Sequence, residues 1–235
     1  MNSSKKTARL AGVLYLLNAI SAGFAFEYVI TKVYAAGDAA TTAANVVANS
    51  GLVRIGVVAD LFQASVWIFL GMTLYLLLKH INKSAAMAMV VLVAVGAAIV
   101  CLNDVFQFES VRVATDTSYA VAFGVAGSNA LVLLLLDMHH YGFLIAQIFF
   151  GLWLVPLGYL AYQSAMFPKM LGVGLIVGSV CYLVGMLVVF LVPDVGEKIN
   201  IIVTIPSAIA EISMVLYLLV VGVRTQKSGE PTAAS

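Results

Sequence analysis

Six long apolar stretches constrain the fold of this chain more than any other feature. They cover approximately residues 10–30, 52–78, 85–108, 141–162, 171–192 and 199–223. About 20 apolar residues, rising about 1.5 Å each, cross the hydrocarbon core of a bilayer. Backbone N–H and C=O groups find no water there and must form hydrogen bonds within the segment, so each stretch is expected to be helical. The alternation of apolar and polar residues that is typical of barrel strands is absent. The sequence predicts an all-α polytopic membrane bundle of six transmembrane helices, with residues 1–224 as one domain and 225–235 as a disordered cytoplasmic tail.

The composition also indicates that most of the chain is surrounded by lipid. Hydrophobic residues make up 63% of the sequence and charged residues only 10%, whereas a soluble domain carries about 25% charged residues. The lipid bilayer is therefore the main expected partner. A net charge of +1 provides no basic surface for nucleic acid, so we expect no nucleic-acid partner.

The basic residues predict the orientation of the spans. With the N-terminus inside, the inner side holds eight of them: Lys5, Lys6, Arg9, Lys79, Lys83, Lys169, Arg224 and Lys227. The outer side holds four: Lys32, Arg54, Arg112 and Lys198. Cytoplasmic loops are enriched in Lys and Arg, so both termini are expected in the cytoplasm. The first stretch exceeds the roughly 7–15 residue core of a cleaved signal peptide and is expected to be retained.

Segment 119–136 is apolar enough to leave a seventh span as an alternative. If it crossed the membrane, Lys169, Arg224 and Lys227 would move outside, and the basic residues would divide six against six. We expect this segment to lie at the outer surface, or to be partly inserted, and to lead into the fourth span. A second outer element is predicted after Asp38, which can cap a short helix lying against the bundle or the membrane interface.

Small residues in the fifth span predict close helix packing. Gly174 and Gly178 form a pair four residues apart, a spacing that lets two helices approach closely. Packing within the chain is one interpretation of this pair. A homodimer contact through the same two glycines is the other.

Polar side chains gather toward the predicted outer side. Asp60 lies in the outer third of the second span, Asp104 near the outer end of the third, and Asp137 at the start of the fourth. Asp60, Gln63 and Trp67 share one helix face, as do Asn103 and Gln107. These faces predict a polar vestibule if they meet in the bundle. Interfacial ion pairs and helix caps are the alternative.

The fourth span opens with the densest group of ionisable residues. Asp137 precedes His140 by three residues and Tyr141 by four, so these side chains can meet on a helix. His139 lies between them, and Gln147 is two turns further along the stripe of His140. Arg54 and Arg112 are the counter-ions available from the same side.

Glu211 is the deepest ionisable residue, about halfway along the sixth span. A charged carboxylate is strongly disfavoured at that depth. Thr204, Ser207 and Glu211 share a helical stripe, and Pro206 weakens the helix near Ile202. This predicts a proton or cation site. The alternative is a protonated Glu211 that hydrogen-bonds within the bundle, with Asn18, Ser179 and Tyr182 as available partners.

No sequence pattern identifies a catalytic residue or a cofactor. Nucleophile signatures and phosphate-binding loops are absent, and Cys101 and Cys181 lie in apolar segments, where they are expected to be small buried residues. We therefore expect no cofactor and no metal in the leading interpretation. The alternative is a metal held by Asp60, Asp137 and His139, with Asp104 as a further ligand. Adjacent histidines point about 100° apart on a helix, so only one of His139 and His140 would join such a site.

A set of short motifs resembles one known family. In chain order the motifs lie at residues 9–12, 37–45, 54–61, 137–144, 149–152, 157–160, 164 and 168–172. Asp137-x-His139-x-Tyr141-Gly142-Phe143-Leu144 is the strongest of them. Together they resemble a bacterial multi-pass membrane family catalogued as domain of unknown function 4386. The resemblance implies a bacterial inner-membrane protein and favours His139 over His140 as the motif histidine, but it implies no activity.

These observations predict a non-enzymatic protein that handles a small solute, a cation or a proton, or senses a ligand, through an outward-facing polar vestibule. Its expected ligand- or ion-binding residues are Asp60, Arg54, Asp104, Asp137, His139, His140, Tyr141, Gln147 and Glu211. An intramembrane metal-assisted hydrolase or transferase is one alternative. A structural subunit of a membrane complex is another.

Overall fold

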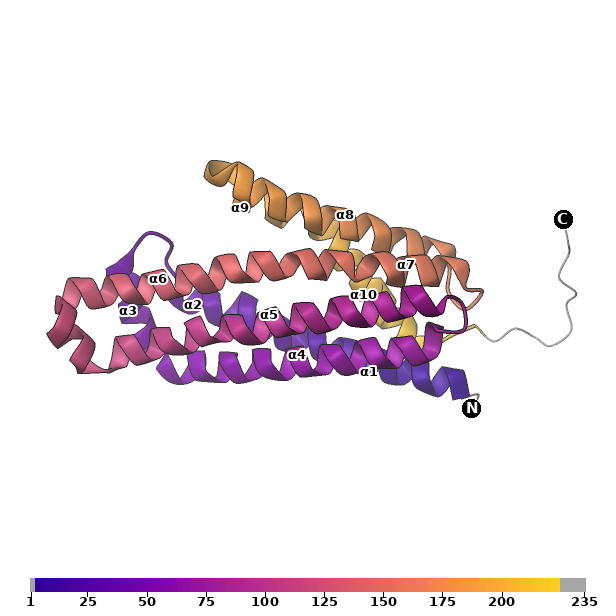
Figure 1. Ribbon diagram of the computed structural model, residues 1–235, viewed down its shortest axis with the longest axis horizontal. Coiled ribbons are helices and arrows are strands. Elements are labelled where there is room, and N and C mark those ends of the chain that lie inside the picture. The colour runs from indigo at the N-terminus through magenta and orange to yellow at the C-terminus, as the bar shows by residue number, and fades with distance from the viewer. Residues whose placement is uncertain (1–2, 225–235) are drawn as a thin grey trace, which may run out of the picture. The chain divides into compact units, whose positions relative to one another are not determined.

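The structure is a computed structural model that describes residues 3–224. In this range the chain is helical and contains no strand (Figure 1). The helices are α1 (Ser3–Ala22), the π-helix η1 (Gly23–Ile30), α2 (Thr31–Val33), α3 (Ala39–Ala48), α4 (Ser50–Leu78), α5 (Lys83–Thr115), α6 (Thr117–Leu152), α7 (Leu154–Gln163), α8 (Lys169–Leu191), α9 (Pro193–Val203) and α10 (Ile205–Val220). The predicted tail at 225–235 lies outside the described residues.

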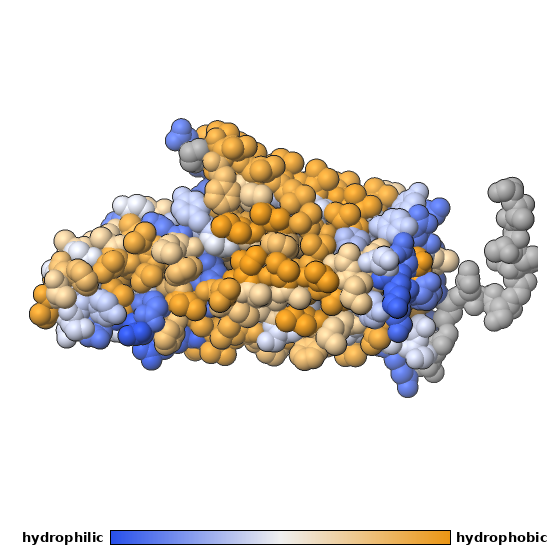
Figure 2. Space-filling view, in the orientation of Figure 1, coloured by the Kyte–Doolittle hydropathy of each residue, from blue (hydrophilic) through white to orange (hydrophobic). Residues whose placement is uncertain are grey.

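Six helical segments within residues 3–224 are long and apolar enough to cross a membrane. They are Ser3–Val33, Ser50–Leu78, Lys83–Thr115, Thr117–Gln163, Lys169–Leu191 and Asp194–Val220. Large hydrophobic side chains are exposed along them, and Figure 2 shows such residues covering the middle parts of the helices. The prediction of a six-span helical membrane bundle is confirmed.

Lysine–tyrosine contacts mark several ends of the apolar segments. Lys79 lies 5.6 Å from the ring centre of Tyr75 at the end of α4, and Lys169 lies 5.3 Å from that of Tyr162. Tyrosine and lysine are typical of the membrane–water interface, where the ring is half in lipid and the ammonium group reaches water. These contacts are of the kind expected where the end of a span meets that interface.

Segment 119–136 is the first part of α6, the helix that continues into the fourth span. The 28 residues of α6 that follow Gly124 extend about 42 Å at about 1.5 Å per residue, beyond a hydrocarbon core of about 30 Å. The helix bends at Gly124, whose φ of 73° lies in the left-handed region that favours glycine. The segment is therefore an extension of the fourth span, as expected, and forms no separate seventh span.

Contacts within the chain divide the helices into two compact units. The first unit comprises Met1–Val13, Met72–Val90 and Gly151–Ser235, and the second comprises Leu14–Gly71 and Val91–Phe150. The prediction that residues 1–224 form one domain stays a prediction. Each unit is described below by itself.

Small residues bring the helices of the first unit close together. A Cβ atom at Gly178 would lie 2.9 Å from the Cα of Ser207, and one at Gly174 would lie 3.6 Å from the Cβ of Ala210. Both glycines of α8 therefore pack against α10 of the same chain, and the Ser207 hydroxyl donates a hydrogen bond to the Gly178 carbonyl (2.7 Å). A homodimer through this glycine pair stays a prediction.

The sixth span is interrupted where Pro206 lies. Helix α9 ends at Val203, Thr204 separates it from α10, and Pro206 lies in the first turn of α10. Proline has no N–H to donate to the carbonyl of Ile202, which explains the break. The predicted weakening of the helix near Ile202 is therefore confirmed.

Helices α4 and α5 of the second unit are antiparallel with a constant register. Gly71 faces Val93, Gly96 faces the ring of Trp67, and Gly56 faces Gln107. The two helices approach closely because a glycine takes part in each of these pairs. A Cβ atom at Gly96 would lie 2.6 Å from the Trp67 ring.

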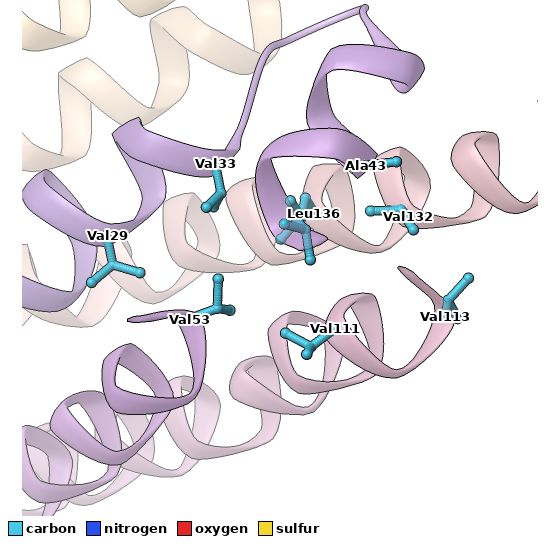
Figure 3. Close-up of a cluster of buried hydrophobic side chains, with 9 residues drawn as sticks. Val29, Val33, Ala43, Val53, Val111, Val113, Val132 and Leu136 are labelled. Atoms are coloured by element: carbon cyan, nitrogen blue, oxygen red, sulfur yellow. The ribbon is translucent and has the colours of Figure 1, made fainter. Parts of the chain in front are cut away.

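An apolar cluster closes the end of the second unit that carries α3 (Figure 3). We call it the valine cluster; its buried members are Val29, Val33, Ala43, Val46, Val53, Val111, Val113, Val132 and Leu136. Helix α3 contributes Ala43 and Val46 to it. The predicted helix after Asp38 is thus present, and its apolar face packs against the end of α5 and the middle of α6.

Asp38 caps α3 as predicted. Its carboxylate accepts hydrogen bonds from the backbone N–H of Thr41 (2.9 Å) and from the Thr41 hydroxyl (2.7 Å). These two bonds, the backbone bond first, hold the pKa of Asp38 below its ordinary value. The stabilisation by this cap is therefore complete above the ordinary pKa of aspartate, and it is lost as the pH falls through the lowered value.

Replacing this cap should loosen α3 without unfolding the spans. Asp38→Ala removes both acceptors, so the amides of α3 should exchange hydrogen faster, whereas Asp38→Asn keeps an acceptor oxygen and should protect α3 more nearly as the wild type does. Hydrogen–deuterium exchange followed by mass spectrometry of residues 39–48 measures the difference. Equal protection in the wild type and Asp38→Ala would show that the cap does not hold the helix.

Candidate functional site

Three ionisable side chains from three helices meet inside the second unit. Asp60 comes from α4, Asp104 from α5 and His139 from α6. One carboxylate oxygen from each aspartate and one ring nitrogen of the histidine all lie within 4.8 Å of one another. The side chains are buried, with exposed fractions of 3%, 3% and 2%. We call this group the Asp–Asp–His cluster.

The register of the helices explains why these residues meet. Gly56 faces Gln107, and Asp60 follows Gly56 by one helical turn while Asp104 precedes Gln107 by about one turn. Because α4 and α5 run in opposite directions, one turn forward on α4 and one turn back on α5 lead to the same height along the helix pair. Asp60 and Asp104 therefore lie side by side. On α6, His139 reaches the same layer, and its Nε2 atom lies 4.0 Å from Oδ1 of Asp104.

The cluster holds more acidic groups than the described part of the protein neutralises. Within residues 3–224, neither Asp60 nor Asp104 forms an ion pair with a lysine or arginine. Both carboxylate oxygens of Asp104 and Nδ1 of His139 are buried without a hydrogen-bond partner in that range. A buried carboxylate is stable only when it is protonated, paired or bound to a metal. The arrangement can therefore bind a cation or hold protons.

Asn103 fixes the position of α6 beside the cluster. Its side-chain Nδ2 donates a 2.8 Å hydrogen bond to the backbone carbonyl of His139. This contact requires glycine at position 142, because a Cβ atom there would overlap the Asn103 amide. One turn beyond Asp60 on α4, Nε2 of Gln63 donates to Oδ1 of Asn18 (2.9 Å), which ties the first span to the same region.

Asp137 is engaged elsewhere and is not part of the cluster. The hydroxyl of Tyr34 donates a 2.6 Å hydrogen bond to its Oδ1 atom. His140 stacks on the ring of Tyr34, with ring centres 5.6 Å apart, and makes an edge contact with Tyr141. Residues two apart on a helix point about 200° from each other, so Asp137 and His139 face different neighbours. Asp104 thus takes the place beside Asp60 and His139 that the metal alternative gave to Asp137.

The remaining predicted site residues occupy separate environments. Arg54 is exposed on α4, and its predicted companion Arg112 pairs with Glu109 at 2.8 Å. Gln147 is buried on α6. Asp60, Asp104, Gln147 and His139 are each at most 5% exposed, so these four side chains line no open space in the structure.

Glu211 belongs to the first unit. Its Oε1 atom accepts a 2.9 Å hydrogen bond from the hydroxyl of Tyr182, one of its three predicted partners. Asn18, the second, is bonded to Gln63 in the other unit, and Ser179 Oγ is buried without a partner among the described residues. Glu211 therefore has the neutral tyrosine partner that the sequence suggested.

The structure adds Gln107 to the polar residues near the cluster. Its helical spacing to Asn103 is visible in the sequence, but Gln107 was not among the expected site residues. The side chain is fully buried, and both of its amide atoms lack a hydrogen-bond partner within residues 3–224. A repeated polar position at one-turn spacing inside an apolar span was the signal that could have identified it.

Comparison with known proteins identifies the family. Residues 10–222 match the model of a family described as a domain of unknown function, DUF4386. The chain belongs to this family. The resemblance inferred from the sequence motifs is thereby confirmed. No curated protein and no solved structure matches the chain.

The DUF4386 match includes every residue of the Asp–Asp–His cluster and both glycines that shape it, Gly56 and Gly142. The description of the family states no activity. Functional inference for this DUF4386 protein therefore depends on the geometry and chemistry of the cluster.

The packing of Asn103 on Gly142 can be tested by a pair of glycine substitutions. Gly142→Ala should lower the stability by about 1–3 kcal/mol, because the added methyl group displaces the Asn103 amide from the His139 carbonyl. Gly51→Ala is the matched control: a Cβ atom at this helical position would meet no heavy atom within 4 Å, so the change should be neutral or stabilising. Thermal unfolding of the detergent-solubilised protein measures both. Equal midpoints for the two variants would contradict the close packing.

Proposed function

We propose that this protein handles a cation in the cytoplasmic membrane of a bacterium, and that the cation is a divalent transition metal bound by Asp60, Asp104 and His139. The observation that carries the proposal is the convergence of three buried ligand atoms within 4.8 Å, without a basic residue among residues 3–224 to neutralise them. The non-enzymatic cation-handling role inferred from the sequence thus acquires a specific site.

The chemistry of the three side chains favours this class of ion. Two carboxylates balance the charge of a divalent cation, and such a cation removes the cost of burying them. Calcium and magnesium prefer sites made of oxygen ligands, whereas an imidazole nitrogen suits zinc, iron and other transition metals. A set of two aspartates and one histidine therefore favours an ion such as Zn²⁺ or Fe²⁺, which accepts both kinds of ligand.

The depth of the cluster supports access from the outer side. Asp60 lies 18 residues before Leu78, the last residue of α4, or about 27 Å along that helix. Asp104 lies 21 residues after Lys83, the first residue of α5, or about 32 Å. The hydrocarbon core is about 30 Å thick, so the cluster lies close to the membrane boundary opposite the α4–α5 turn. Lys79 and Lys83 at that turn favour a cytoplasmic position for it.

A metal-assisted hydrolase or transferase is the second candidate. Three protein ligands with a further coordination position are typical of catalytic metal sites, whereas structural sites have a full set of protein ligands. The thiol of Cys101 lies close enough to Asp104 and Asp60 to interact with both electrostatically, but the sequence around it carries no signature of a catalytic nucleophile. We therefore favour ion handling over catalysis.

Metal analysis of purified protein tests the proposal directly. After treatment with a chelator and reloading with Zn²⁺, the wild type should retain about one ion per chain, whereas Asp104→Asn and His139→Ala should each bind at least about tenfold more weakly because a ligand is lost. Asp137→Asn is the matched control, since this acid lies on the same helix as His139 but bonds to Tyr34. Inductively coupled plasma mass spectrometry measures the content. A wild type with no retained metal, or variants equal to it, would refute the site.

The proposed orientation has its own test. In a background without Cys101 and Cys181, we expect Lys32→Cys to react with a membrane-impermeant maleimide in intact bacterial cells, because position 32 is on the outer side in the proposed topology. Lys83→Cys should react only after the cells are opened, because the α4–α5 turn then faces the cytoplasm. Mass shift on a gel measures the labelling. The opposite pattern would reverse the topology.

A further inference from the structure

Gln107 is a buried amide that its described neighbours do not satisfy. The residue has an exposed fraction of 0%, and neither Nε2 nor Oε1 has a hydrogen-bond partner among the described residues. Its backbone is held in place, because the hydroxyl of Ser110 donates a 2.7 Å hydrogen bond to the Gln107 carbonyl. An amide buried without partners is costly, and native structures seldom retain one without a reason.

The amide lies in the layer next to the Asp–Asp–His cluster. Gln107 follows Asp104 by three residues on α5, and Gly56, which it faces, precedes Asp60 by four residues on α4. A Cβ atom at position 56 would lie 3.3 Å from Nε2 of Gln107. The missing side chain at Gly56 therefore lets the Gln107 amide approach the backbone of α4 one turn from Asp60.

The opposite side of this layer is apolar. A Cβ atom at Gly56 would lie 2.9 Å from Cγ1 of Val29, a member of the valine cluster. Val53 and Val111, one turn further along α4 and α5, belong to the same cluster. Gln107 thus lies along α5 between members of the valine cluster and the Asp–Asp–His cluster.

We propose that Gln107 positions a water molecule on the metal, in a coordination position that a small anion can occupy instead. The inference rests on the proposed metal site, whose three protein ligands leave such a position open. A glutamine amide suits this task because Oε1 accepts a hydrogen bond from the water while Nε2 donates to an anion that replaces it. Gln107 is a positioning residue, and the metal ligands remain Asp60, Asp104 and His139.

An exchangeable position matters for the proposed function. A metal that enters and leaves its site exchanges its protein ligands for water one at a time, and a bound water beside a fixed amide provides the first exchange partner. The same position would accept the substrate of a metal-assisted reaction.

Cobalt substitution provides the test, because the visible absorption of Co²⁺ responds to its ligands. The full-length protein in detergent is loaded with Co²⁺ and titrated with sodium azide, a small anion. We expect azide to change the spectrum of the wild type. Gln107→Leu should bind the same amount of Co²⁺ but bind azide about three- to tenfold more weakly, which corresponds to the loss of one hydrogen bond.

Gln63→Leu is the matched control. It removes another buried amide of the second unit, on α4 one turn beyond Asp60, but this amide is bonded to Asn18 and lies on the side of Asp60 away from Gly56. We expect its azide affinity to equal that of the wild type. If Gln107→Leu does not fold, Gln107→Met replaces it with the same expectation.

The outcomes separate the two proposals. If the wild type binds no Co²⁺, the metal site itself is refuted. If the wild type binds Co²⁺ but azide leaves its spectrum unchanged, or if Gln107→Leu binds azide as tightly as the wild type, the metal site stands and the role of Gln107 is refuted. An equal loss of azide affinity in Gln63→Leu would also refute it, because the effect would then be general to the bundle.

Discussion

Burying two carboxylates inside apolar helices is the physical constraint on which the rest of this site depends. Asp60 and Asp104 lie side by side without a lysine or arginine partner in the described part of the chain, and His139 offers its Nε2 atom 4.0 Å from Asp104. Charge in such surroundings is unstable unless a proton or a cation balances it. The amides of Asn103 and Gln107 and the valine cluster above limit what can reach these oxygens. The proposed cation binding follows from this combination of negative charge and burial.

The close approach of the helices makes the cluster geometrically feasible. Aspartate has a short side chain, so two aspartates on neighbouring helices meet only when the backbones are near each other. Gly56 and Gly96 allow this between α4 and α5, and Gly142 allows α6 to approach the Asn103 amide. A close approach of two helices at a glycine also occurs in the first unit, where Gly178 of α8 contacts Ser207 of α10. Small residues thus serve packing in both units, and in the second unit they also shape a polar site.

Residue spacing along each helix predicted many of the site residues. Which of them come together depended on which helix faces contact one another in the folded protein. The shared face of Asp60, Gln63 and Trp67 is buried as the helical period suggested, and the cluster contains one of the two adjacent histidines, His139. Asp137 looked equally suitable because it stands in the same motif. Its position two residues before His139 turns it toward Tyr34 instead, and no pattern within α6 reveals that partner 103 residues away. For Gln107, the sequence shows only its helical spacing to Asn103. That its amide lacks hydrogen-bond partners among the described residues depends on how the helices pack.

The sequence by itself determined the helical membrane class, the six spans, the break at Pro206 and the cap at Asp38, because each depends on local chemistry: apolar length, a missing N–H, a carboxylate beside free amides. Family membership likewise followed from ordered motifs along the chain. Only the tertiary structure decided that Asp104 joins Asp60 and His139, that Asp137 bonds to Tyr34, and that the three cluster side chains are buried. These outcomes depend on the register between the helices. Many weak contacts, several of them at glycines, set this register together, so the sequence of one helix alone does not determine it.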